Sequence, residues 1–136
     1  MQLTITTDYA IRIALLLSLS QRTISIPELS EKLHIPKSYV PRIITMLKKA
    51  DIVDSSRGQH GGIYLKKSPE QITFKVIFDA VVETIKINRC LEEDKFCSRC
   101  ATDDCPVRNF YTNLQDYLDK RFSETSIIGA TQCDAI

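Results

Sequence analysis

Apolar residues recur at helical spacing in several stretches of this chain, and one short stretch between them resembles a hairpin of β-strands. The first apolar stretch follows Thr6 or Thr7, either of which suits an N-cap, and runs to about Ser18. Because it is apolar nearly all round, we expect a buried helix there. Further on, Ser25 and Glu28 have capping-box spacing, which predicts a second, short helix that the following HIPKS stretch ends.

A third helix is predicted from Ser38, as N-cap, to about Ala50, with Pro41 harmless in its first turn. Its apolar face should pack inward and consists of Val40, Ile43, Ile44 and Leu47. A second face, at the same spacing, consists of Tyr39, Arg42, Met46 and Lys49 and can read DNA. Two helices in this order form a helix-turn-helix, whose second helix fits the major groove of DNA. Such a corner also occurs as plain architecture.

Residues 52–68 are typical of a strand, a Gly-rich loop and a second strand. A hairpin placed directly after a helix-turn-helix is the wing of a winged helix. Arg57 at the base of the loop and His60 near its tip are placed to reach a phosphate or the minor groove. For His60, a solvated position in the loop is the plainer interpretation.

Two more helices are predicted after the wing. Thr73 is a candidate N-cap for a helix that completes the core with Val76, Ile77, Ala80 and Val81. A long amphipathic helix then carries apolar residues at Val107, Phe110, Tyr111, Leu114, Tyr117, Leu118 and Phe122. In a DNA-binding protein such a helix usually pairs with its copy in a second subunit. Packing on its own domain is the alternative, and the last residues, with a free Cys133, are expected to form a loose tail.

These elements predict a mainly α fold with a small β-wing. The expected architecture is a winged helix-turn-helix DNA-binding domain followed by a long C-terminal dimerisation helix. We place the DNA-binding domain at 1–84, a cysteine-rich loop at 85–106, the dimerisation helix at 107–125 and the tail at 126–136.

The formal net charge of +1 is unevenly distributed along the chain. Seven basic residues between Lys37 and Lys67 are accompanied only by Asp51 and Asp54, so the middle of the chain is basic. A basic surface suits the phosphate backbone of DNA, although solvated faces are charged too. The candidate DNA contacts are Lys37, Ser38, Tyr39, Arg42, Lys49, Arg57, Gly58 and His60.

Four of the five cysteines lie in RCLEEDKFCSRCATDDCP at 89–106. The chain shows no export signal and no apolar stretch long enough to cross a membrane, so we expect it in the cytoplasm, where thiols stay reduced. Clustered cysteines then indicate metal binding or redox chemistry. All four could form a closed zinc site. A thiol–disulfide pair in CSRC lacks the setting such pairs need, and no catalytic constellation predicts an enzyme.

The chain resembles the Rrf family of bacterial winged-helix transcription regulators, which includes iron–sulfur and nitric oxide sensors. The resemblance rests on LTITTDYAIRIAL at 3–15, on SYVPRIITMLKKADIVDSSRGQHGG at 38–62, and on the cysteine loop before the last helix. Its most specific part is the RGxxGG wing. Ile63 departs from the family pattern because it separates the glycine pair from Tyr64, which leaves the strand register open by one residue.

The resemblance implies a homodimer on a palindromic operator in double-stranded DNA, with no membrane partner. It also implies a 2Fe-2S or 4Fe-4S iron–sulfur cluster held by three cysteines and a fourth, non-cysteine ligand. In nitric-oxide-sensing members that ligand is an acidic residue in the first helix of the partner subunit, and Asp8 falls on its position. A carboxylate on iron is displaced more easily than a thiolate, which suits a sensor. The alternative role for Asp8 is to stabilise the helix N-terminus.

The cysteine spacing departs from the family pattern, which is close to C-x5-C-x5-C. Here six, two and four residues separate Cys90, Cys97, Cys100 and Cys105. Cys90 and Cys105 match the outer positions, and either Cys97 or Cys100 is the middle ligand.

The position of Arg108 is held by a histidine ligand in some members of the family, and His34 is only a remote substitute for it. We therefore predict a dimeric transcription regulator, most simply a repressor, controlled by an iron–sulfur cluster that senses nitric oxide, redox or iron–sulfur status. A regulator with structural zinc, or with no metal, is the alternative.

Overall fold

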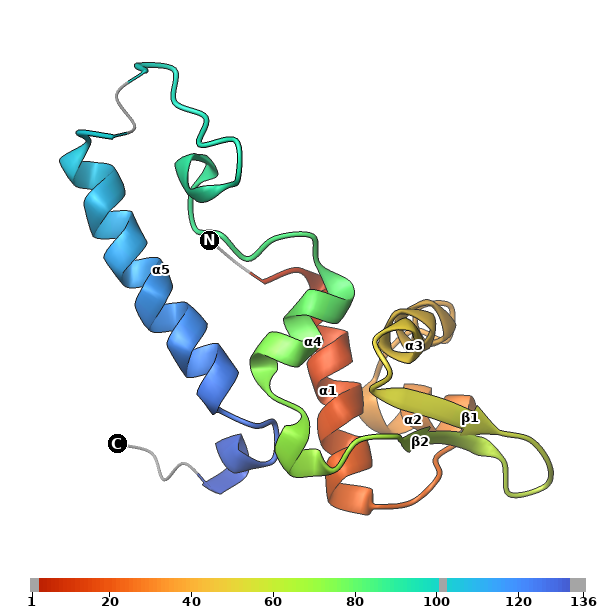
Figure 1. Ribbon diagram of the computed structural model, residues 1–136. Helices are drawn as coiled ribbons and strands as arrows, with labels where there is room; N and C mark the ends of the chain where they lie inside the picture. Colours follow the sequence, from red (N-terminus) through yellow and green to blue (C-terminus); the bar gives the residue numbers. More distant parts are fainter. Residues whose placement is uncertain (1–2, 101–102, 133–136) are drawn as a thin grey trace.

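The computed structural model describes residues 3–100 and 103–132, so Cys133 lies outside the described part. The fold is mainly α with one small antiparallel sheet, as the sequence predicts. The first four helices and the sheet pack together, and the long last helix runs beside the fourth, on the side away from the sheet (Figure 1). Within the described residues, no helix is long and apolar enough to span a bilayer.

The first helix, α1 (Ile5–Ser20), lies at the centre of the packed body. Its predicted start at Thr6 or Thr7 is wrong, because Thr4 is the N-cap and its hydroxyl accepts the backbone N–H of Thr7 at 3.2 Å. Thr7 is fully buried inside the first turn. The helix buries Ala10, Ile13, Ala14 and Leu17 in the core, whereas its apolar ends reach solvent.

The helix-turn-helix consists of α2 (Ile26–Leu33) and α3 (Val40–Lys49). Ser25 caps α2 as predicted, since its hydroxyl accepts the N–H of Glu28 at 3.3 Å. The prediction of Ser38 as N-cap of α3 is wrong. Residues 37–39 form a turn in which the N–H of Tyr39 donates to the carbonyl of Pro36 at 2.9 Å, and the helix begins after it without a side-chain cap. The predicted inner face is confirmed, with Val40, Ile43, Ile44 and Leu47 buried.

The wing consists of β1 (Val53–Ser56), β2 (Gly62–Leu65) and the loop between them. The strand register pairs Ser55 with Ile63, so the side chain of Ile63 enters the core and that of Tyr64 faces outward. Gly62 has φ +155°, and a Cβ there would lie 2.5 Å from the carbonyl oxygen of Ile24. The close approach of these backbones therefore requires glycine at this position.

Helices α4 (Phe74–Val81) and α5 (Pro106–Glu124) lie beside each other (Figure 1). Thr73 caps α4 as predicted and accepts the N–H of Val76 at 3.2 Å. The fourth helix completes the core with Ile77 and with Phe78, which the predicted face had not included. Phe78 meets Phe122 of α5 edge-to-face with ring centres 4.9 Å apart. This contact joins the long helix to the packed body formed by the first four helices and the sheet.

The described part of the C-terminal segment is not a loose tail. The N–H of Ile127 donates to the carbonyl of Ile72 at 2.7 Å, and the N–H of Phe74 donates to the carbonyl of Thr125 at 3.1 Å. The side chain of Ile127 is only 2% exposed. The prediction of a loose tail is wrong for these residues because Ile127, one of two adjacent isoleucines in a polar segment, completes the core next to α4.

Candidate functional site

The outer face of α3 and the turn before it present the residues predicted to contact DNA. Lys37, Ser38, Arg42 and Lys49 are all exposed. The ring of Tyr39 meets that of Tyr9 edge-to-face, with centres 5.8 Å apart. The turn is thus fixed against α1, and Arg42 and Lys49 of α3 face solvent.

Local acids engage two of the basic residues in the middle of the chain. Lys66 Nζ lies 2.8 Å from Asp51 Oδ1, and Lys48 Nζ lies 3.7 Å from Asp54 Oδ1. The hydrogen bond from Lys66 lowers the pKa of Asp51, and the carboxylate raises the pKa of Lys66. Within residues 3–100 and 103–132, no ion pair involves the other five, which are Lys37, Arg42, Lys49, Arg57 and Lys67. These cations are available to an anionic ligand.

The tip of the wing is a tight, exposed loop. The N–H of Gly61 donates to the carbonyl of Gly58 at 3.0 Å, and Gly58 has φ +108°, which favours glycine. Arg57 and His60 are exposed beside it. The loop therefore exposes Arg57 and His60 at the end of the wing, and their contact with DNA stays a prediction.

Three of the four loop cysteines border one cavity at the start of α5. This cysteine cavity has a volume of about 300 Å³, and its lining includes Cys90, Cys97, Cys105, Phe96, Arg108 and Tyr111. Cys90 lies in the 3-10 turn Arg89–Leu91, and Cys105 is the N-cap of α5. Thiols are preferred ligands of iron in iron–sulfur clusters and of zinc, so the donor set suits either metal.

Cys100 is placed differently from the other three. It is exposed, has φ +52° and does not line the cysteine cavity. Its N–H donates to the carbonyl of Cys97 at 3.0 Å, which turns the chain there. Among the described residues, no three His, Cys, Asp or Glu side chains converge closely enough to hold a metal ion. Cys90, Cys97 and Cys105 therefore border one cavity without meeting at one point in it.

Asp8 lies in the first turn of α1 and does not line the cysteine cavity of its own chain. Its Oδ2 lies 2.7 Å from an Nη of Arg12, and both side chains remain nearly half exposed. His34, the remote candidate, is the left-handed C-cap residue of α2 and is exposed in a turn. The structure thus brings neither residue to the cysteines within one chain.

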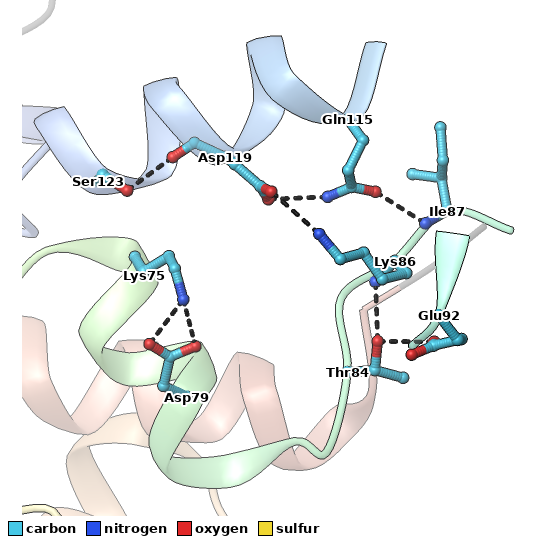
Figure 2. A network of polar contacts seen from close by, with 9 residues as sticks. All are labelled: Lys75, Asp79, Thr84, Lys86, Ile87, Glu92, Gln115, Asp119 and Ser123. Atoms are coloured by element: carbon cyan, nitrogen blue, oxygen red, sulfur yellow. Dashed lines mark hydrogen bonds and ion pairs between the residues drawn. The ribbon is translucent and has the colours of Figure 1, made fainter. Parts of the chain in front are cut away.

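A polar network ties the first residues of the cysteine-rich loop to α5 (Figure 2). Gln115 is 3% exposed, and its Oε1 accepts the backbone N–H of Ile87 at 2.9 Å. Its Nε2 donates to Asp119 Oδ1 at 2.8 Å, and Lys86 Nζ donates to the other carboxylate oxygen at 3.2 Å. Gln115 was not predicted as a contact residue, although a single glutamine between Tyr111 and Leu118 on the apolar face of a helix indicates a buried polar contact.

The long helix α5 has two apolar faces. Its inner face packs on its own chain, with Tyr111, Leu118 and Phe122 half-buried. Its outer face carries an exposed stripe, between 37% and 63% accessible, that consists of Val107, Phe110, Leu114 and Tyr117. Alternating steps of three and four residues are the spacing of a two-helix coiled-coil seam. The helix can therefore pack on its own domain with one face and pair with a second subunit through the other.

The winged helix-turn-helix, with its exposed basic face and wing, belongs to the class of DNA-binding transcription regulators. Residues 3–129 match the family model of Rrf2, which is described as an iron-dependent transcriptional regulator. The chain therefore belongs to the Rrf2 family. This finding confirms the family predicted from the sequence.

Individual relatives agree with this assignment. The chain is 29% identical over 97 residues to the transcriptional regulator NsrR of Bacillus licheniformis, which covers 70% of this chain and 68% of that protein. Its fold is similar to that of CymR, the global cysteine regulator of B. subtilis, with a TM-score of 0.81, 19% identity and 99% of each chain covered. It is also similar to T. potens IscR, with a TM-score of 0.75, 16% identity and coverage of 97% and 87%. These relatives are regulators and not enzymes.

Proposed function

We propose that this Rrf2 regulator is a homodimeric repressor whose binding to a palindromic operator is controlled by an iron–sulfur cluster on Cys90, Cys97 and Cys105. The observation that carries the proposal is the cavity that these three cysteines share at the start of α5. The family's description as iron-dependent supports the choice of iron. A zinc site made by all four cysteines would need Cys100, which lies outside the cavity, and is less well supported.

For the fourth ligand we propose Asp8 of the partner subunit. Asp8 does not line the cysteine cavity of its own chain. Its carboxylate is partly exposed in the first turn of α1, where a second subunit could reach it. Arg12 pairs with it and would have to share or release the carboxylate on ligation. This pairing also orients the Asp8 carboxylate.

Bound at these residues, the cluster would supply iron that reacts with nitric oxide or oxygen. Cys105 links the site to α5 because it is both a proposed ligand and the N-cap of that helix. Cys90 is linked to the same helix through the side chain of Arg108, whose Nε donates to the Cys90 carbonyl at 3.1 Å. Changes at the cavity would thus act on the position of the dimerisation helix.

For dimerisation, we propose that the exposed stripe of α5 packs against the same stripe of a second copy. A row of four exposed, large apolar side chains is typical of a protein interface, and its coiled-coil spacing suits α5 of a second copy. The inner face of α5 remains on its own domain through Phe122 and Gln115. A shift of α5 in the dimer would therefore also move the DNA-binding domain of the same chain.

For DNA recognition, we propose that α3 enters the major groove and that the wing contacts the backbone. Arg42 and Lys49 on the exposed face of α3 are the proposed base and phosphate contacts, with Lys37, Ser38 and Tyr39 before them. In the wing, Arg57, Gly58 and His60 would approach a phosphate or the minor groove.

The pair Cys97→Ser and Cys100→Ser tests the proposed ligand set after anaerobic purification. We expect Cys97→Ser to lose iron, sulfide and visible colour, and Cys100→Ser to keep all three, because only Cys97 borders the cavity. The two cysteines lie in the same turn and so provide matched controls for folding. Equal loss in both variants, or loss in Cys100→Ser alone, would contradict the assignment.

A further inference from the structure

We infer that Arg108 is a positioning residue of the cysteine site, which holds Cys90 on the first turn of α5 and thereby beside Cys105. The identity of the metal group rests on the proposed function, whereas the positioning role rests on contacts within the chain. In the family pattern, Arg108 only replaces a histidine ligand. The structure gives it contacts of its own.

Arg108 contacts both outer cysteines of the loop. Its side-chain Nε donates to the backbone carbonyl of Cys90 at 3.1 Å, across eighteen residues of sequence. Its backbone N–H points to Cys105 Sγ at 3.5 Å, as part of the N-cap of α5. One residue therefore joins the 3-10 turn that carries Cys90 to the helix end that carries Cys105.

The network around Gln115 makes this link effective. Lys86 and Ile87 are held on α5 by Asp119 and Gln115, only a few residues before Cys90 (Figure 2). Together with Arg108, these contacts anchor the chain on both sides of residues 92–104. Cys90 and Cys105 are thus fixed to one helix, while Cys97 lies on the segment between the anchors.

The charge of Arg108 also suits an anionic group in the cavity. Its half-buried guanidinium borders the cavity and, within the part of the chain that the structure describes, makes no ion pair. Arg89 borders the same cavity but is paired with Asp94. A guanidinium has no free lone pair and stays protonated, so Arg108 cannot replace the histidine as a ligand. It can offset the negative charge that thiolates and a carboxylate bring to a cluster.

The first test measures cluster stability in the anaerobic full-length protein, with Lys120→Met as a control for loss of positive charge from the same helix. We expect Arg108→Met to lose visible absorbance to a chelator about 10-fold faster than the wild type, as for other residues that orient metal ligands. Arg108→Lys keeps the charge but not the planar donor, and its loss rate should be intermediate. Circular dichroism checks folding, and Arg108→Lys serves as the test variant if Arg108→Met is unfolded.

The second test needs no cluster. In a chain with Cys97, Cys100 and Cys133 replaced by serine, dibromobimane becomes fluorescent when it bridges Cys90 and Cys105. We expect bridging to be about 10-fold slower with Arg108→Met and unchanged with Lys120→Met. Unchanged bridging in the folded variants would overturn the positioning role, even if the cluster were less stable. A wild type without a cluster would refute the proposed function, and the bridging rate would still decide the role of Arg108.

Discussion

The side-chain carbonyl of Gln115 accepts the backbone N–H of Ile87 at 2.9 Å, so the middle of α5 holds the chain that leads into the cysteine loop. The two partners join α5 to the segment after α4, where Gln115 is almost fully buried and Ile87 is half-buried (Figure 2). A buried donor without a partner is costly, so this contact fixes the segment more strongly than an exposed bond of the same length. It makes α5 part of the domain rather than an appended helix.

Replacing Gln115 by leucine tests this contact. The N–H of Ile87 would lose its acceptor, and we expect a decrease of about 1–3 kcal/mol in the free energy of unfolding. Asn113→Leu, on an exposed position two residues away, should change it by less than about 0.5 kcal/mol. Urea denaturation followed by circular dichroism measures both, and equal stabilities would show that the buried amide contributes little.

A charge on the exposed stripe of α5 should separate the subunits. We expect Leu114→Asp to give a folded monomer, because an aspartate at the centre of an apolar seam would be buried without a partner. Asn113→Asp adds the same charge outside the stripe and should leave the dimer intact. Light scattering gives the mass of each variant, and a dimeric Leu114→Asp would place the subunit contact elsewhere.

Two arginines should affect DNA binding in different ways. Arg57→Ala in the wing should weaken binding to all sequences and lower the slope of log K against log salt by about one unit. Arg42→Ala on α3 should instead relax base preference by about 1–3 kcal/mol. Titrations of operator and random DNA at several salt concentrations distinguish the two. Equal effects on both DNAs would exclude Arg42 as a reader of bases.

Removal of the Asp8 carboxylate should affect the cluster and leave the fold intact. We expect Asp8→Ala to remain a dimer that binds DNA, because the side chain is nearly half exposed and its ion pair with Arg12 is at the surface, where such pairs contribute little stability. Its cluster should be less stable or respond differently to nitric oxide. The anaerobic visible spectrum before and after nitric oxide measures this, with Asp116→Ala as control. An unchanged spectrum and response would remove Asp8 from the site.

Glu28 should contribute to the dependence of stability on pH. Hydrogen bonds from Arg22 and Lys32 lower its pKa from the ordinary 4.5 to about 2 in the folded protein. A lowered carboxyl pKa contributes stability that is present above the ordinary value and is lost as the pH falls from about 4.5 to about 2. Glu28→Gln should therefore lose less stability than the wild type over this range. Identical profiles from denaturation at each pH would contradict this assignment.

Local patterns predicted much of the fold. Ser25 and Thr73 cap helices as expected, because capping needs only a hydroxyl and an N–H three residues away. The same rule misplaced the start of α1, since three threonines compete there and burial of Thr7 selects Thr4. The burial of Ile127 was not predicted because Ile72, whose carbonyl accepts its N–H, is distant in the sequence. Contacts of this kind depend on packing that a local pattern does not contain.

The cysteine site was predicted as a group of residues but not as an arrangement. Spacing alone left Cys97 and Cys100 equivalent, because chain distance from Cys90 and from Cys105 favoured opposite choices. The turn that joins them places Cys97 at the cavity and Cys100 in solvent. From the sequence, Arg108 only marks a position where some family members have a histidine ligand. Its contact with the Cys90 carbonyl was not predicted, because it depends on how the loop returns to α5.

The metal content of the wild-type protein, purified without oxygen, tests the central claim most directly. We expect a coloured protein that contains iron and acid-labile sulfide in equal amounts, with no stoichiometric zinc, because the three cysteines at the cavity and the proposed Asp8 carboxylate suit an iron–sulfur cluster. A colourless protein with one zinc per chain would contradict it.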